Sequence, residues 1–208
     1  MNQYLLMIEA NVASREEKDK RLNFWLALFL GIITCGLYSI YVLYCLIRRN
    51  EQHLDRSYKL FEDTRNLLKE GADAKGFPVK DEVVRIEIAI RDRIEKKEAV
   101  LWIVLTLFVP FAGLYVYYFL NKDLRLHEKQ EKAFFDALNQ AFGKLQKPLV
   151  VYEPKTPDRN FWLYLVLTLV TCGLFGLYWY YVLIEDGNRH FDEHARAEDV
   201  LLANLKGL

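Results

Sequence analysis

Residues 159–184 read RNFWLYLVLTLVTCGLFGLYWYYVLI, and this stretch decides how the chain is organised. From Phe161 to Ile184 it contains no charged side chain. A helix needs roughly 20 apolar residues to cross the hydrocarbon core of a bilayer, which is about 30 Å thick. The stretch is therefore long enough to span a membrane, and its Trp and Tyr residues are of the kind that collect where lipid meets water.

A similar stretch occurs 137 positions earlier. Residues 21–47 read RLNFWLALFLGIITCGLYSIYVLYCLI, with Asn-Phe-Trp and Thr-Cys-Gly-Leu at the same spacing in both stretches. Beyond the apolar part, His53 still corresponds to His190. A weaker third copy lies between them, in which Trp102 and Gly113 keep the Trp-to-Gly spacing. We interpret the chain as three copies of one membrane module.

Charged segments follow each apolar run, and their apolar residues recur at helical spacing. Residues 48–70 and 79–98, separated by a turn with two glycines, predict an antiparallel helical hairpin outside the bilayer. Residues 147–157 contain too many prolines for a helix, and a short strand at 149–152 is compatible with their pattern.

These observations predict an all-α integral membrane protein with three repeated apolar segments and amphipathic helices outside the membrane. The expected units are 14–70, with the first membrane repeat and a charged helix; 79–146, with the return helix of the 48–98 hairpin, the second repeat and a charged helix; and 156–208, with the third repeat and a charged tail.

Composition excludes several classes of function. The chain of 208 residues has 28 basic and 28 acidic side chains, so it lacks the basic surface that nucleic acids require. The apolar runs contain no ionisable side chain of the kind used by proton-coupled transporters. No catalytic constellation occurs, so we expect neither an enzyme nor a cofactor.

Two arrangements of the apolar runs compete. In the first, which we favour from the sequence, each run is one spanning helix, although Lys and Arg are distributed almost evenly over the two resulting sides. In the second, each run is a re-entrant hairpin that breaks near its middle, and all charged tails face one side. Each arm would then be only about 16 Å long and could not cross a bilayer.

The middle of each run contains small or helix-breaking residues. A break here could expose carbonyls and hydroxyls to an ion or a lipid head group. Small residues also let membrane helices pack closely, and we favour this second interpretation. The residues concerned are Thr34, Cys35 and Gly36, Pro110 and Gly113, and Thr171, Cys172 and Gly173.

Aromatic residues at the ends of the runs predict an interfacial belt, which is a commoner use of such residues than a polar path. The belt would contain Trp25, Tyr41, Trp102, Tyr118, Trp162, Tyr178 and Trp179.

One weak metal candidate occurs in the last tail. His190 and His194 are one helical turn apart, and Asp186 lies on the same helix face. His53 has no second histidine beside it, which argues against a repeated metal site. We therefore predict no metal site.

The third copy resembles a bacterial membrane-protein family that is known only as a domain of unknown function, with the signature T-x-G-[IL]-Y-x-x-Y-W. The resemblance is carried by 161–162, 171–174 and 178–180. In the first copy Val42 replaces the signature Trp, and in the second Phe111-Ala112 replaces Thr-Cys. The resemblance implies a bacterial inner-membrane protein and carries no activity.

The expected function is that of a non-enzymatic membrane scaffold or accessory subunit. Its expected partners are membrane lipids and either further copies of itself or another membrane protein. The alternative is a small oligomeric channel or lipid-handling protein, lined by Thr34, Thr171, Tyr41 and Tyr178.

Overall fold

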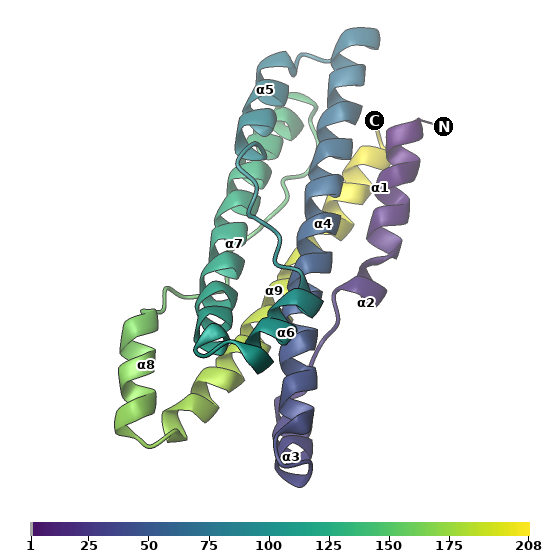
Figure 1. Ribbon diagram of the computed structural model, residues 1–208. Coiled ribbons are helices and arrows are strands. Elements are labelled where there is room, and N and C mark those ends of the chain that lie inside the picture. The colour runs from purple at the N-terminus through teal and green to yellow at the C-terminus, as the bar shows by residue number, and fades with distance from the viewer. Residues whose placement is uncertain (1) are drawn as a thin grey trace.

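The computed structural model describes residues 2–208, and over this range α-helix is the only regular secondary structure (Figure 1). The predicted all-α fold class is therefore confirmed. In chain order the helices are α1 (Gln3–Ala13), α2 (Arg15–Lys18), α3 (Phe24–Ile33), α4 (Leu37–Ala74), α5 (Lys80–Ala89), α6 (Ala99–Phe108), α7 (Ala112–Lys144), α8 (Phe161–Val170) and α9 (Leu174–Lys206).

Three long helices form the frame of the molecule. Helix α4 has 38 residues and α7 and α9 have 33 each, so at a rise of about 1.5 Å per residue each is about 50 Å long or longer. Helix α1 packs along α4 and α9, and α5 packs along α4 and α7. Figure 1 shows the short helices α3, α6 and α8 in the lower half of the view and both termini in the upper half.

The interior contains two apolar cores. One includes Leu60, Phe134 and Leu201 and lies where α1 and α5 pack on the frame. The other includes Ile47 and Ile184 and lies where the short helices join the frame. Between them, the inward positions of α4, α7 and α9 are polar and buried: Arg49, His53, Arg56, Ser57, Asn121, His127, Glu128, Glu131, Asp186, His190, His194 and Glu198. We call this set the polar layer.

The favoured prediction of one spanning helix per apolar run is not what the structure shows. Each run is split into a ten-residue helix and the start of a long helix, which fold back on each other as α3–α4, α6–α7 and α8–α9. Over residues 2–208, no helix is both long enough and apolar enough to cross a membrane. The physical reason is the tight turn in the middle of each run.

The charged segments differ in detail from the predicted hairpin of 48–98. Helix α4 continues to Ala74, whereas α5 ends at Ala89 and residues 92–98 lead to α6 without helix. Residues 147–157 are not helical, and the strand considered at 149–152 is absent. Instead the backbone of Val150 bonds the side chain of Asn139 in α7, at 2.8 and 2.9 Å.

Arg49 connects α4 to α9 where the second core meets the polar layer. Its guanidinium donates to the carbonyl oxygens of Leu183 and Ile184, both at 2.9 Å, and to Oδ1 of Asn188 at 3.0 Å. The side chain is buried, and Gly187 lies directly against it. A Cβ atom at Gly187 would stand only 2.7 Å from Cζ of Arg49, so any larger residue here displaces the guanidinium.

The change Gly187→Ala should lower the free energy of unfolding by about 2–4 kcal/mol, because it pushes a buried guanidinium away from its acceptors. Urea denaturation followed by far-ultraviolet circular dichroism measures this loss.

The matched control is Gly143→Ala in α7, where an added Cβ would meet no atom of residues 2–208 within 4 Å. It should leave stability unchanged or raise it by up to about 1 kcal/mol, since alanine favours helix. Equal losses in both variants would contradict the role given to Arg49.

Candidate functional site

Exposed apolar side chains gather on the three broken runs. Within residues 2–208, 33 large apolar side chains are strongly exposed, and 25 of them belong to 24–47, 99–120 and 161–184. None of these segments contains a charged residue. We call the three helix–turn–helix units the hairpins, and the turn end of each hairpin its tip. Helices α3, α6 and α8 are their short arms (Figure 1).

The tips of the first and third hairpins have the same backbone conformation. Cys35 and Cys172 both have a φ of 50°, and Gly36 and Gly173 both have a φ of 92°. This region is one that glycine adopts at little cost. The N–H of Gly36 donates to the carbonyl of Gly31 at 2.8 Å, and the corresponding bond in the third hairpin is also 2.8 Å. Such bonds are typical of a helix that ends at a left-handed glycine.

A threonine completes each of these tips. The hydroxyl of Thr34 donates to the carbonyl of Leu30 at 2.7 Å and accepts from the N–H of Tyr38 at 2.9 Å. Thr171 makes the same two bonds at the same distances. Every backbone N–H from Thr34 to Ser39 therefore has an acceptor inside the turn. The turn needs no water to satisfy its N–H groups.

The second tip is built differently from the predicted break at Pro110 and Gly113. The turn occupies 109–111 and reverses at Phe111, which has a φ of 65°, while Gly113 lies within α7. Gly113 and Gly176 instead face the short arm of their own hairpin, with a threonine methyl 3.4 and 3.2 Å from where a Cβ would stand. The packing interpretation thus fits Gly113 and Gly176, whereas the glycines at 36 and 173 serve the turn itself.

The aromatic residues of the predicted belt do not all face outward. Trp25, Tyr41, Trp162 and Tyr178 are exposed, and Trp102 and Tyr118 are half-buried. Trp179 is the exception that corrects the prediction. It is buried, because α8 folds back over α9 and places Phe161 and Tyr164 against its ring.

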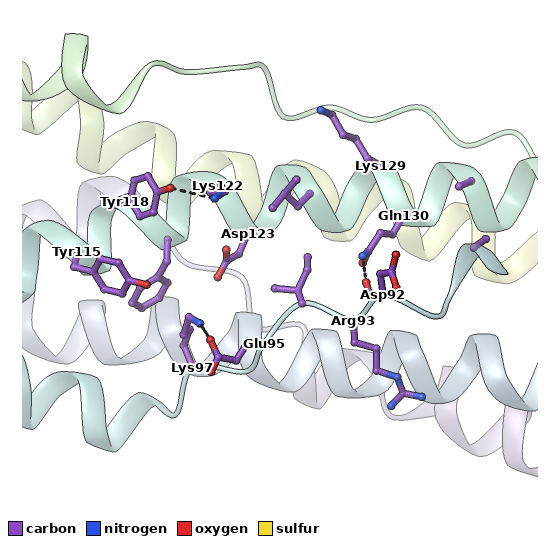
Figure 2. A pocket seen from close by; sticks show the side chains of 15 residues that line it. Asp92, Arg93, Glu95, Lys97, Tyr115, Tyr118, Lys122, Asp123, Lys129 and Gln130 are labelled. Atoms are coloured by element: carbon purple, nitrogen blue, oxygen red, sulfur yellow. Dashed lines mark hydrogen bonds and ion pairs between the residues drawn. The ribbon is translucent and has the colours of Figure 1, made fainter. Parts of the chain in front are cut away.

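Basic residues pair with tyrosines near the base of two hairpins. Lys20 lies 3.5 Å from the hydroxyl of Tyr41, and Lys122 donates to the hydroxyl of Tyr118 at 3.1 Å. Beside the second pair is an open cleft of about 530 Å³, lined by both signs of charge (Figure 2). Figure 2 shows Glu95 and Lys97 entering it from the connection between α5 and α6, opposite side chains of α7. Burial raises the pKa of Asp123 in this cleft to about 6.

The polar layer brings together all four histidines of the chain. His53 in α4, His127 in α7, and His190 and His194 in α9 are completely or almost completely buried around Glu131 of α7. Nε2 of His53 and Nε2 of His190 face each other at 2.7 Å. The carboxylate oxygen Oε1 of Glu131 lies 2.8 Å from Nε2 of His127 and 3.0 Å from Nε2 of His194.

Further carboxylates surround these rings. Nδ1 of His53 is 2.9 Å from Asp19, Nδ1 of His190 is 3.2 Å from Glu128, and Nδ1 of His194 is 3.1 Å from Glu198.

Other segments close the layer from outside. The linker between α7 and α8 covers it, since Tyr152 donates its hydroxyl to Glu131 and the N–H of Thr156 donates to Glu128. Arg56 pairs with Asp19 and Glu198.

Burial and neighbouring charges shift the pKa values of groups in the polar layer in opposite directions. Burial lowers the pKa of His127 to about 4 and also lowers that of His190. Burial acts in the same sense on His194, but Glu131 and Glu198 outweigh it and raise the pKa of His194 to about 10. Burial opposes ionisation of Glu131, yet the surrounding histidines hold its pKa well below its ordinary value.

The weak metal candidate from the sequence is only partly assembled. His190 and His194 do meet in the layer, but Asp186 is turned away and pairs with Arg159 and Arg189. Each step of four residues turns the side-chain direction by about 40° around the helix axis, and Asp186 and His194 are two such steps apart. The two side chains therefore face different neighbours. The sequence analysis missed His127 and Glu131 altogether. The available signal was that every histidine of the chain lies in the first half of a charged tail.

The comparisons with known proteins bear on the third hairpin. Residues 159–204 match a family described as a domain of unknown function (DUF4234). No curated protein and no solved structure matches the chain. The expected similarity to a family of unknown function is therefore supported over α8 and nearly all of α9, and this family brings no activity with it.

Proposed function

We propose that this protein is a membrane scaffold whose three hairpins insert into one leaflet of a bilayer while the long helices stand outside it. The observation that carries the proposal is the concentration of exposed apolar side chains on three charge-free hairpins. The resemblance of the third copy to a bacterial membrane-protein family suggests that this membrane is the cytoplasmic membrane of a bacterium.

The length of the hairpins supports insertion into a single leaflet. Each short arm has ten residues and is therefore about 15 Å long. This is half of the roughly 30 Å hydrocarbon thickness of a bilayer. The tips also satisfy the main requirement of hydrocarbon, because the turn at 34–39 provides its own acceptors for backbone N–H groups.

The energy of exposed apolar surface points the same way. Full exposure of one large apolar side chain to water costs about 1.5–3 kcal/mol. The 25 side chains on the hairpins are between 38% and 81% exposed. Scaled by these fractions, their total cost in water is on the order of 20–45 kcal/mol. Lipid around the hairpins removes this cost.

The hairpins also leave space between them. A cavity of about 450 Å³ lies between α4, α7 and the third hairpin, lined mainly by apolar side chains such as Leu43, Leu114 and Leu165. Acyl chains would fill it in a bilayer. The lysine–tyrosine pairs at Lys20 and Lys122 lie at the hairpin bases, where head groups would be.

Hairpins that enter only one leaflet add volume to that leaflet, which suits a wedge or membrane-shaping scaffold. The oligomeric channel considered from the sequence receives less support. The hydroxyls of Thr34 and Thr171, two of its expected lining groups, are occupied by the bonds that close the tips.

Charges placed on the hairpins should abolish membrane binding. The triple variant Phe29→Asp, Val104→Asp, Val166→Asp puts one carboxylate on each hairpin at an exposed position. Each charge costs about 3 kcal/mol in hydrocarbon, so binding to vesicles of phosphatidylethanolamine and phosphatidylglycerol should be lost. Co-flotation after synthesis in the presence of vesicles measures it.

The matched control for flotation is Val84→Asp, Ile88→Asp, Val200→Asp. These apolar residues are also exposed, but they lie on α5 and α9 away from the hairpins. The control should float like the original protein. Loss of flotation in both variants, or in neither, would refute the assignment of the hairpins as the membrane-binding surface.

The native cysteines allow a measurement of depth. Cys35 and Cys172 are exposed at two tips, and Cys45 is buried. Nitroxide labels on the tip cysteines, in a Cys45→Ala background, should lie about 12 Å deeper in the bilayer than labels at Trp25 and Trp162. Electron paramagnetic resonance with oxygen and a water-soluble nickel complex as relaxants gives this depth. Tip labels that the nickel complex reaches freely would rule out insertion.

The long helices should all lie on one side of the membrane. Single cysteines at the exposed positions Lys69, Lys129 and Arg196 report on α4, α7 and α9 in turn. In sealed vesicles with a uniformly oriented protein, an impermeant maleimide should label all three alike. If Lys129 behaves differently from the other two, the second hairpin crosses the bilayer and the one-leaflet arrangement is wrong.

A further inference from the structure

Four side chains from three helices converge in the polar layer with the spacing of metal ligands. His53, His127, Glu131 and His190 each place one ligand atom within 4.8 Å of the others. Individual separations are 2.7 Å between Nε2 of His53 and His190, and 3.7 Å between Nε2 of His53 and Oε1 of Glu131. Ligands held about 2.0–2.1 Å from a tetrahedral ion stand about 3.3 Å apart, which lies within this range.

The ligand atoms share too few partners. Oε1 of Glu131 is shared between Nε2 of His127 at 2.8 Å and Nε2 of His194 at 3.0 Å. Within residues 2–208, Nδ1 of His127 has no hydrogen-bond partner. Buried polar groups usually have partners of their own. A cation among the four side chains would give the nitrogens of His53 and His190 and the carboxylate of Glu131 a common partner.

The outer faces of the rings resemble the surroundings of metal-bound histidines. Such histidines usually offer their second nitrogen to a carboxylate, which fixes the orientation of the ring. Asp19 does this for Nδ1 of His53 at 2.9 Å, and Glu128 lies 3.2 Å from Nδ1 of His190. Both rings thus direct Nε2 toward the centre.

The charge balance of the site also favours a cation. Asp19, Glu128, Glu131 and Glu198 bring four carboxylates to the histidines, with side chains at most 8% exposed, whereas Arg56 pairs only with Asp19 and Glu198. A second group of possible ligands consists of Asp19, His53 and His194. It already holds a positive charge, because Arg56 contacts both Asp19 and His194. Within residues 2–208, Glu128 and Glu131 pair with histidines and with no Arg or Lys.

From these observations we propose that His53, His127, Glu131 and His190 bind one divalent transition-metal ion, which joins α4, α7 and α9. Imidazole and carboxylate ligands without thiolates suit first-row ions such as zinc, iron, cobalt or nickel, and they suit magnesium and calcium poorly. Because the ligands fill the site and are buried, its role is structural. A cavity of about 400 Å³, lined by Arg15, Glu16, Asp19 and Arg21 among others, reaches Asp19, whose carboxylate lies 2.9 Å from Nδ1 of His53.

Cobalt binding by the complete chain tests this proposal directly. The protein is purified in detergent, stripped with a chelator, and titrated with Co²⁺. We expect visible absorption bands of about one tetrahedrally bound ion per chain, which Zn²⁺ removes and which Mg²⁺ and Ca²⁺ leave unchanged. Absence of these bands, or equal displacement by Ca²⁺, would mean adventitious binding to surface carboxylates and would overturn the proposal.

Variants then locate the site. His127→Gln removes one ligand but keeps a side chain that can still donate to Glu131, so the fold should persist, as far-ultraviolet circular dichroism can verify. Its affinity for Co²⁺ should fall at least about 100-fold. The control Asp63→Asn alters a buried carboxyl of α4 outside the layer and should bind like the original chain. Equal affinity in all three proteins would refute the assignment.

A third measurement stays informative even if a variant folds poorly. With free Zn²⁺ roughly 100-fold above its dissociation constant, the unfolding midpoint of the original chain should rise by about 5–10 °C over the chelated form. The Asp63→Asn control should show the same rise, and His127→Gln should show none. An unchanged midpoint in the original chain would contradict a structural metal.

Discussion

The hydrogen bonds that close the hairpin tips determine most of this architecture. A chain that reverses direction leaves N–H groups outside any helix, and hydrocarbon offers them no partners. Thr34 and Gly36 solve this problem together, because the hydroxyl acts as both donor and acceptor and the glycine adopts a positive φ. Thr171 and Gly173 repeat the solution. Each apolar run can therefore fold on itself without a neighbouring helix.

The tips also set the height of everything beyond them. His53 and His190 stand at the same offset from the first residues of α4 and α9, and His127 stands one position closer to the first residue of α7. At about 1.5 Å per residue, all three are about 24 Å from their tips. They meet because these heights agree. A leaflet core of about 15 Å ends before this height, so the polar layer would lie outside the hydrocarbon.

The positions of the turns, which set these heights, were only partly predictable from the sequence. Composition and spacing predicted the helical class. They gave a break that reverses each apolar run only as the less favoured alternative, because a glycine can serve a turn or the close packing of an unbroken helix. Alignment on Gly113 also placed His127 out of register, since the second turn, at 109–111, comes earlier relative to Trp102 than the first turn does relative to Trp25.

The remaining errors have a common physical origin. Asp186 shares a helix with two histidines, but Arg159, which is distant in sequence, pairs with it instead. Trp179 is of a residue type that is common at membrane interfaces, but α8 folds back over α9 and buries it. Both outcomes depend on which distant segment of the chain packs against the side chain. Helical periodicity gives the face of a residue and does not give its neighbour.

The position of the polar layer between two apolar cores has a structural consequence. Apolar surfaces tolerate sliding of one helix past another, whereas a polar cluster loses its partners when the register changes. A slip of one turn, about 5.4 Å, would separate Glu131 from the histidines of α4 and α9 and would also move a tip by about a third of a leaflet. The layer thus holds the three hairpins at one height relative to one another, and the apolar cores on either side supply the cohesion that the layer itself does not.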